Sequence, residues 1–259
     1  MKIRVASWNV RGLPCPQRQI WLLADRHLDI LLLQDVSRRA TDAISSSGHW
    51  KSVATSLNCG PHPQAGCLVA ARADWQFTDS TGIPGDASSS RALAVSAVNH
   101  GVAVTLVSCY APTNVGHGRK ERPGFFNALA DWLSTLSAPF MLGIDANGPR
   151  TDHPDITRNE WWVPEESSVL GVGTSTEDAL RRWYVDHPDA LRRRVQYYPR
   201  GPLADSYHRG RKGRFVRSRY DSIRISPGII VEEVNYLYDE ALAAGSDHAL
   251  VVAVLAVTD

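Results

Sequence analysis

The stretch FMLGIDAN, residues 140–147, is a short apolar run that ends in an acid and an amide. A run of this length and composition, closed by residues that favour turns, is typical of a buried β-strand. Asp145 and Asn147 are ordinary turn formers, but they also carry the oxygen ligands and proton acceptors that catalytic sites use. The stretch therefore predicts a central strand whose polar residues lie at one edge of a sheet.

The same kind of run recurs along the chain and predicts a β-rich fold. The expected strands are residues 3–10, 29–34, 66–72, 92–99, 102–110, 140–144, 220–225, 229–236 and 248–257. His100-Gly101 joins two of them and predicts a tight hairpin. Helical spacing of apolar residues appears in residues 17–28, 122–136 and 176–195, the last broken at Asp186-His187-Pro188. This mixture indicates an α/β or α+β fold in which helices cover sheets.

Composition limits the class of protein. The chain has 259 residues, of which 43% are hydrophobic, enough for a substantial core. We expect a single domain over residues 1–259, with an irregular, Arg-rich and Trp-containing insertion around residues 149–218. The net charge of +1 gives no global field that favours nucleic acid or membrane, so any preference for a polyanion must come from local clusters.

The four cysteines and the apolar runs indicate a compartment. Cys15, Cys59, Cys67 and Cys109 form no C-x-x-C pair, and no signal peptide precedes the first strand. No run approaches the roughly 18 apolar residues of a membrane span. We expect a cytoplasmic protein with free thiols, a Cys59–Cys67 bridge being the alternative. The oligomeric state is open, with a monomer as the default.

Polar residues stand at the ends of several predicted strands. They are Asn9, Asp35, Asp145, Asn147, Asp221, Asp247 and His248. Each one alone is most simply a strand terminator or turn residue. Together they supply carboxylates, amides and an imidazole, which is the set that a hard cation and a phosphate group require.

At these residues the chain resembles the endonuclease/exonuclease/phosphatase superfamily, which contains the DNase I-like and exonuclease III-like enzymes. Six motifs carry the resemblance, in the family's order: SWNV (7–10), LLQDV (32–36), SCYAP (108–112), GIDAN (143–147), RYDSI (219–223) and SDHALV (246–251). Each motif is weak alone, but the six span nearly the whole chain. The resemblance implies an α/β fold, a four-layered α/β/β/α sandwich of two packed mixed sheets flanked by helices.

The resemblance also implies a metal site made of Asp35, Asn9 and Asp247, with Mg²⁺ as the ion. Asp35 stands where the family has glutamate, which shortens the reach of the carboxylate by about 1.5 Å, one C–C bond length. A closer ion, a bridging water, or a weaker site that prefers Mn²⁺ would accommodate this change.

The remaining motif residues acquire catalytic roles from the resemblance. Asp145 would orient or deprotonate the attacking water, and Asn147 would hold a phosphate oxygen. His248, hydrogen-bonded to Asp221, would stabilise negative charge that develops on phosphorus. Tyr110 would donate a hydrogen bond to the phosphate, although packing within the strand explains a tyrosine there equally well.

The substrate is predicted from a basic segment. Residues 192–219 contain ten Lys or Arg residues and one acid, Asp205, interleaved with aromatic residues. They suggest a surface that tracks phosphates, with Arg214, Arg217 and Arg219 as substrate contacts and Asn114 as a further one. A solvated or disordered loop is the alternative. The pair Trp161-Trp162 either stacks against bases or packs a loop onto the core.

These observations predict a divalent-metal-dependent phosphodiesterase, most simply a nuclease that acts on DNA or RNA. A phosphatase or phosphodiesterase for a phospholipid or small phosphorylated molecule is the alternative. A catalytically weakened nucleic-acid-binding module is a third possibility, motivated by Asp35. Endonuclease or exonuclease action, lesion preference and the number of metal ions are all left open.

Overall fold

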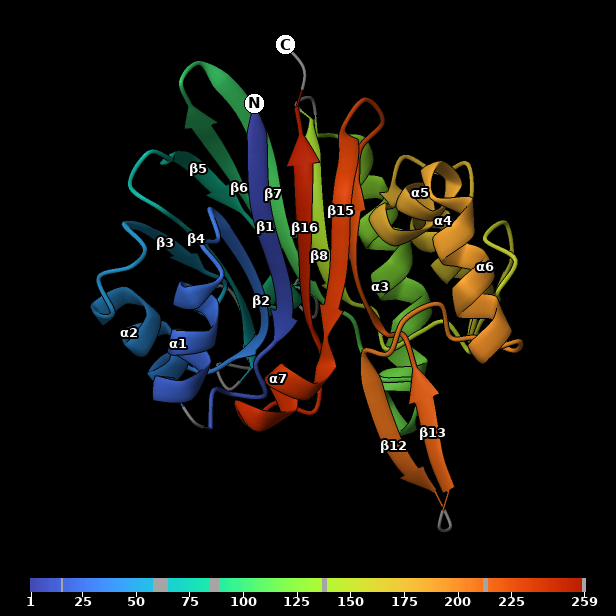
Figure 1. Cartoon of the computed structure of the whole chain (residues 1–259). Helices are drawn as coiled ribbons and strands as arrows, with labels where there is room; N and C mark the ends of the chain where they lie inside the picture. The colour runs from blue at the N-terminus through green and yellow to red at the C-terminus, as the bar shows by residue number, and fades with distance from the viewer. Residues whose placement is uncertain (15, 58–64, 84–88, 137–138, 212–213, 258–259) are drawn as a thin grey trace.

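The computed structural model of the chain describes residues 1–14, 16–57, 65–83, 89–136, 139–211 and 214–257. Within these residues the strands form two six-stranded mixed sheets and two short two-stranded ribbons. The two large sheets pack against each other, and helices lie on both outer faces (Figure 1). The four-layered α/β/β/α sandwich predicted above is confirmed.

Each large sheet contains one parallel pair near its centre. In the first sheet β1 and β2 are parallel, and its order is β15 (Ile230–Leu237), β16 (Leu250–Ala256), β1 (Lys2–Asn9), β2 (Ile30–Val36), β4 (Gly66–Ala71) and β3 (Ser52–Thr55). In the second sheet β7 and β8 are parallel, and its order is β11 (Glu177–Asp178), β14 (Asp221–Ile225), β8 (Phe140–Asp145), β7 (Val102–Tyr110), β6 (Ala92–Asn99) and β5 (Gln76–Thr81). The ribbons pair β9 (Thr151–Asp152) with β10 (Asn159–Glu160), and β12 (Tyr207–Arg211) with β13 (Arg214–Ser218).

The helices cover the sheets through separate apolar clusters. The outer face of the first sheet packs against α1 (Pro16–Asp25), α2 (Arg38–Ser46) and α7 (Tyr238–Ala243). The outer face of the second sheet packs against α3 (Gly116–Ser134) and α4 (Ser167–Leu170), which follows the 3-10 turn η2 (Pro164–Glu166). Farther along the chain lie α5 (Ala179–Asp186) and α6 (Pro188–Tyr197), and a second 3-10 turn, η1 (Ser89–Arg91), precedes β6.

Period-two alternation of side chains explains the layers. In β1, Ile3 and Val5 lie in the cluster between the sheets, whereas Ala6 and Trp8 lie under the helices of the outer face. All four are fully buried or nearly so. Because successive side chains of a strand point to opposite faces, an apolar strand in the middle layers must be apolar on both sides. The unbroken apolar runs in the sequence reflect this requirement.

The two sheets approach closely at Gly143 of β8. A Cβ atom added there would lie 2.7 Å from both the Leu32 Cβ and the Ser7 Oγ of the opposite sheet. We expect Gly143→Ala to lower the free energy of unfolding by roughly 1–3 kcal/mol, because a packed interior cannot absorb the extra carbon. Chemical denaturation measures the change. Gly124→Ala on α3 is the matched control, since nothing lies within 4 Å of its added carbon, and it should stabilise the protein slightly.

The two short helices predicted within residues 176–195 are confirmed as α5 and α6, whereas β3, β5 and α7 were not predicted. The interval expected to be irregular also contains α4 and the β12–β13 hairpin, which projects beyond the body of the molecule (Figure 1). Its alternating charged residues gave no apolar face by which a strand could be recognised. Helix α2 was also missed; it is short and polar, and it begins where the Ser37 Oγ accepts a hydrogen bond from the Ala40 N–H. A single domain over the whole chain stays a prediction.

Cys67 and Cys109 are free, buried thiols. Cys59, the other member of the alternative bridge, and Cys15 lie outside the described residues. None of the helices in the described part of the chain is both long enough and apolar enough to cross a bilayer.

Candidate active site

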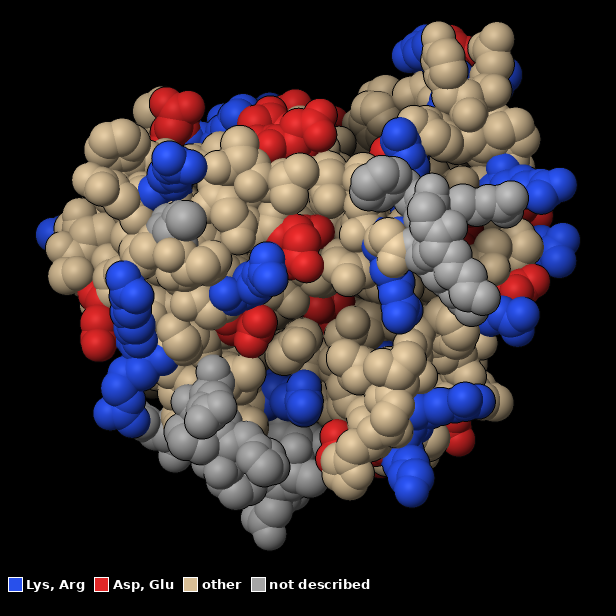
Figure 2. Space-filling view, turned by 90° about the horizontal axis from the view of Figure 1, so that it is seen from below, with Lys and Arg blue, Asp and Glu red and all other residues tan. Residues whose placement is uncertain are grey.

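Polar side chains from both large sheets meet at one edge of the sandwich. They are Asn9, Asp35, Tyr110, Asp145, Asp221 and His248. In the second sheet, Asp145 at the end of β8 pairs with Tyr110 on one side and Asp221 on the other. Figure 2 views the molecule from below, towards this edge, and shows acidic side chains near the middle of the face with basic side chains around them.

Asp145 is buried at the centre of this group, with 1% of its surface exposed. Its carboxylate accepts a hydrogen bond of 2.8 Å from the Asn9 Nδ2 and one of 2.9 Å from the Asn147 N–H. Burial raises the pKa of Asp145 to about 6, although the neighbouring His248 lowers it. The group is therefore mostly ionised at neutral pH while remaining a stronger base than an exposed aspartate.

His248 forms the predicted pair with Asp221. The His248 Nδ1 lies 3.0 Å from each carboxylate oxygen of Asp221 and 3.9 Å from the Asp145 Oδ2. Burial disfavours the charged ring, but Asp221 and Asp145 outweigh burial and raise the pKa of His248 to about 10. The ring is therefore cationic at neutral pH, with its Nδ1–H donated to Asp221.

The β12–β13 hairpin begins directly at this histidine. Tyr207, the first residue of β12, pairs with His248 in an isolated antiparallel bridge, and the two ring centroids lie 4.8 Å apart. Tyr207 also stacks on Tyr220, with centroids 5.5 Å apart. The Ser206 Oγ accepts hydrogen bonds from the Tyr220 and Asp221 N–H groups. The base of the projecting hairpin is thus joined to the strand end that carries Asp221, and it also contacts His248.

Asp35 and Asp247 lie at the same edge, but neither forms a side-chain hydrogen bond with His248 or Asp221. Asp35 is half-buried, occupies a left-handed backbone conformation with φ of 50°, and lies at a bulge in the pairing of β2 and β4. Burial raises the pKa of the Asp35 carboxyl, His248 lowers it and Asp247 raises it. Asp247 is half-buried, and its Oδ1 lies 3.9 Å from the Arg11 Nε.

The predicted metal ligands are therefore not the residues that cluster most tightly. Among the described residues, ligand atoms of Asp145, Asp221 and His248 lie within 4.8 Å of one another. Because His248 is cationic and its Nδ1–H is donated to Asp221, this trio is better suited to moving and stabilising charge than to holding a cation. Asn9, the third predicted ligand, donates its amide N–H to Asp145, and its Oδ1 accepts the Arg11 N–H at 3.0 Å.

The residues around Asp35 nevertheless fit a hard divalent cation. Within the described ranges the Asp35 carboxylate accepts no hydrogen bond and forms no ion pair, and its pKa is raised both by burial and by the negative charge of Asp247. Two carboxylates with an amide oxygen nearby are the oxygen donors that Mg²⁺ and Mn²⁺ bind. An ion there would relieve the repulsion between the two acids.

Asn147 and Tyr110 complete the edge, together with an arginine that the sequence did not reveal. The Asn147 Nδ2 donates to the Ala111 carbonyl at 3.0 Å, which holds the amide beside Asp145. Tyr110 is half-buried, and burial followed by the charge of Asp145 raises its pKa. The guanidinium of Arg91 lies 5.3 Å from the Tyr110 ring centroid, and its charge lowers the pKa of Asp35. Arg91 follows a run of serines that carries no motif.

The predicted substrate contacts separate into three cases. Arg219 is a correction, because its side chain is only 3% exposed and lies in ion pairs with Asp152 and Asp178, so it cannot meet a substrate. Arg217 is exposed but bonded to the Asp205 carboxylate at 2.8 Å. The side chain of Arg214 lies outside the described residues.

Asn114 and the tryptophan pair are placed as follows. Asn114 is half-buried in the loop after β7 and has no hydrogen bond within the described part of the chain. Trp161 packs against the cluster under α3, whereas Trp162 remains 39% exposed. The interpretation that the pair packs a loop onto the core therefore suits Trp161, whereas Trp162 is accessible to a ligand.

A buried ion pair supports the loops on either side of the site. Arg122 on α3 is fully buried, donates from its Nε to the Glu166 Oε1 at 2.8 Å, and also donates to the carbonyls of Pro112 and Ala146. It thereby connects the loop after Tyr110 with the loop after Asp145. The sequence marked Arg122 only as a helix residue, because its partner lies 44 positions away.

We expect Glu166→Gln to lower the free energy of unfolding by about 3–5 kcal/mol, because it leaves the buried Arg122 guanidinium without its counter-charge. Thermal and denaturant unfolding measure the loss. Glu160→Gln is the matched control. Glu160 is half-exposed, and its contact with Arg150 is long, at 3.9 Å, so this replacement should change the free energy of unfolding little. Equal effects of both changes would contradict the supporting role of Arg122.

Comparison with known proteins agrees on the fold. No protein-family model and no curated relative matches the chain. Among solved structures, it is similar to an endonuclease/exonuclease/phosphatase from Bacteroides vulgatus, with a TM-score of 0.72, 14% identity and full coverage of both chains. It is also similar to TDP2 of D. rerio in complex with a single-strand DNA product, with a TM-score of 0.70, 14% identity and coverage of 98% and 99%. The catalytic domain of Xenopus laevis APE2 aligns with a TM-score of 0.69, 15% identity and coverage of 98% and 91%. The chain therefore has the DNase I-like fold of the endonuclease/exonuclease/phosphatase superfamily.

Proposed function

We propose that the protein is a divalent-metal-dependent phosphodiesterase that hydrolyses nucleic acid. The observation that carries this proposal is the buried pair His248–Asp221 beside Asp145, which places a cationic imidazole 3.9 Å from a carboxylate of raised pKa. A base for water and a cation for a phosphate oxygen, side by side, are the two groups that in-line attack on phosphorus requires.

In the proposed reaction a water oxygen forms a bond to phosphorus while its proton passes to Asp145. The ester P–O bond on the opposite side breaks, and the leaving oxygen takes a proton from solvent. The Nε2–H of His248 stabilises the charge that develops on the phosphate oxygens, and Asp221 keeps the ring cationic and oriented. Asn147 and Tyr110 would donate further hydrogen bonds to the phosphate, with Arg91 as an additional cation at the same edge.

Asp35 and Asp247, with Asn9, would hold the metal ion. When bound, the ion would supply positive charge that stabilises the negative charge developing on the phosphate. The side chain of Asp35 reaches about 1.5 Å less far than that of a glutamate, because it has one C–C bond fewer. A Mn²⁺ ion, which is less demanding in geometry than Mg²⁺, would therefore serve the site at least as well.

Nucleic acid is the favoured substrate for two reasons. The β12–β13 hairpin, whose first residue Tyr207 forms a bridge with His248, projects outward from this edge (Figure 1), and it carries the exposed Arg209 and the exposed Arg217, which is paired with Asp205. A solved structure of the same fold, TDP2 of D. rerio, holds a single-strand DNA product. A phosphate-tracking hairpin would add affinity that falls steeply with salt.

A substrate panel tests the proposal. Plasmid DNA, duplex with an abasic site, single-stranded RNA and a phosphoinositide are each incubated with Mg²⁺, Mn²⁺ or EDTA. Nicking or shortening of a nucleic acid in metal but not in EDTA is the expected result. Phosphate release from the lipid alone would assign the phosphatase activity instead. Binding of nucleic acid without hydrolysis in the presence of either metal would support the third possibility, a nucleic-acid-binding module without catalytic activity.

A further inference from the structure

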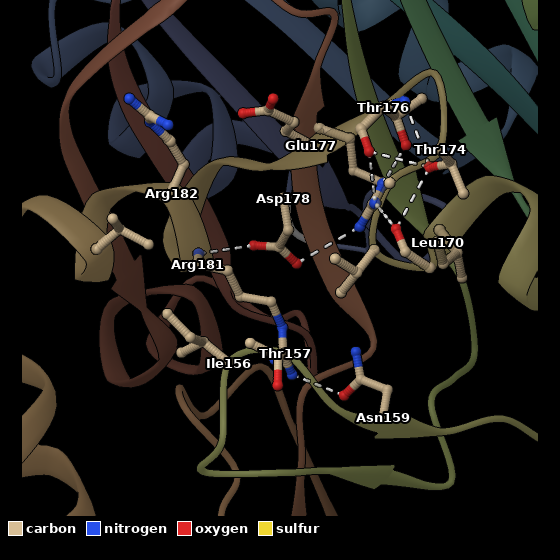
Figure 3. A pocket seen from close by; sticks show the side chains of 15 residues that line it. Ile156, Thr157, Asn159, Leu170, Thr174, Thr176, Glu177, Asp178, Arg181 and Arg182 are labelled. Atoms are coloured by element: carbon tan, nitrogen blue, oxygen red, sulfur yellow. Dashed lines mark hydrogen bonds and ion pairs between the residues drawn. The ribbon is translucent and has the colours of Figure 1, made fainter.

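A second concave site lies on the helical side of the second sheet, apart from the strand-end residues. It is a cavity of 280 Å³ between the loop that carries Ile156, the segment from Leu170 to Asp178, helix α5 and Arg224 of β14 (Figure 3). No residue assigned above to the proposed active site lines it. Its volume is just below the range of about 300–1,000 Å³ that is usual for small-molecule pockets, which suits a small ligand.

The wall of this cavity belongs to a buried cluster with more positive than negative charge. The cluster contains the guanidiniums of Arg181, Arg219 and Arg224 and the carboxylates of Asp152 and Asp178, all at most 9% exposed. Arg219 takes both carboxylates, at 3.0 Å from Asp152 and 2.9 Å from Asp178. Arg181 shares Asp152, and Arg224 reaches Asp178 only at 3.6 Å. Three cations thus share two anions, and buried charge without an anion is costly.

Of the three arginines that line the cavity, the two buried ones, Arg181 and Arg224, are incompletely paired. Arg224 donates mainly to neutral groups, the Thr176 hydroxyl at 2.7 Å and the Thr176 carbonyl at 3.1 Å. Burial, and then the nearby guanidiniums of Arg219 and Arg181, lower its pKa to about 10 despite the attraction of Asp178. The Arg181 Nη atoms donate to the Asp152 carboxylate, the Asn159 Oδ1 and the Asp155 carbonyl, but its Nε is buried and has no hydrogen-bond partner among the described residues. Figure 3 shows Asp178 at the start of α5, where its carboxylate accepts a hydrogen bond of 3.2 Å from the Arg181 N–H.

Two exposed apolar side chains also line the cavity. Val172 and Val185 line it and are 70% and 55% exposed, which is unusual for two branched aliphatic side chains on one rim. Glu177 and Arg182 also lie at the rim, are exposed and carry opposite charges, so they add no net charge. An anionic group would find its counter-charge at the floor, while an apolar body would cover the valines.

We propose that this cavity binds a small organic anion, a molecule with one carboxylate or phosphate head group and an apolar body. The anion would supply the third negative charge that the buried arginines lack, and the body would remove the rim valines from water. This site is independent of the phosphodiesterase activity proposed above.

Calorimetric titration of the full chain in EDTA tests the proposal with three probes that share one ring: benzoate, phenyl phosphate and the neutral benzamide. We expect at least one anion to bind about tenfold or more tightly than benzamide, and to weaken as salt is raised. Binding of benzoate alone or phenyl phosphate alone supports the site and identifies the head group. Absence of binding by both anions at ~10 mM would overturn it, since even a weak pocket reaches millimolar affinity.

Variants at the rim locate the binding. Val172→Glu and Val185→Glu each place a carboxylate at the mouth of the cavity, on exposed side chains whose replacement leaves the core intact. We expect each to weaken the anion by about tenfold or more, through repulsion close to the binding site. Ile230→Glu, a 54% exposed residue of β15, is the matched control and should have no effect. Unchanged affinity in both rim variants would exclude this cavity, whatever the hydrolysis assays show.

Discussion

Replacing Asp145 with asparagine is expected to lower the rate of metal-dependent phosphodiester hydrolysis by ~10²–10⁴-fold, the usual contribution of a positioned general base. The amide keeps the shape of the side chain, and its oxygen can accept one of the two hydrogen bonds that Asp145 receives, that from the Asn9 Nδ2 or that from the Asn147 N–H. The replacement removes the carboxylate that would accept the proton. Burial raises the pKa of this carboxylate to about 6. Hydrolysis of bis-p-nitrophenyl phosphate, measured as kcat/KM at neutral pH in Mn²⁺, is the assay.

Folding must be unchanged for this result to carry meaning. Asp145→Asn removes a buried charge that the protein interior disfavours, so we expect its thermal unfolding to match or exceed that of the unaltered chain. Asp131→Asn, on the exposed face of α3, is the matched control and should retain full activity. If Asp145→Asn kept activity within about threefold, Asp145 could not be the base that the mechanism requires.

The strands of the fold could be predicted because their sequence pattern is local. Residues 92–99 and 102–110 were predicted with the bounds that the structure has. Their connection, His100-Gly101, adopts left-handed φ values of 48° and 83°, which a tight hairpin turn requires and which glycine tolerates. The order of the six motifs resembles that of the superfamily, and this resemblance predicted which strand ends would meet.

The partners of buried charges could not be predicted in the same way. Arg219 and Arg217 stand two positions apart in one basic segment, yet Arg219 is enclosed with Asp152, 67 residues away, and Arg217 is exposed. Arg122 and Glu166 present the same difficulty across 44 residues. From sequence alone, a charged residue is predicted to be exposed to solvent unless its partner is known. Only tertiary contacts determine that partner.

Asp35 is the residue at which sequence and backbone must be considered together. The left-handed conformation at φ of 50° is one that aspartate and asparagine adopt more readily than glutamate. An aspartate, at the position where the superfamily that the chain resembles has glutamate, therefore suits the bulge at this position of β2. Local conformation explains the aspartate, which is compatible with the proposed metal site.

Asp35→Asn and Asp35→Ala should each abolish metal-dependent hydrolysis, because both remove the half-buried carboxylate that has no partner among the described residues. Asparagine keeps the left-handed preference and nearly the same shape, so its loss of activity would be due to charge alone. Mn²⁺ affinity, measured by electron paramagnetic resonance in the absence of substrate, should fall at least about tenfold in both variants, as loss of one ligand predicts. Asp35→Glu should retain activity and move the preference towards Mg²⁺, because it restores ~1.5 Å of reach. Full activity and unchanged Mn²⁺ affinity in Asp35→Asn would remove Asp35 from the metal site and leave the ion to Asp247 and Asn9.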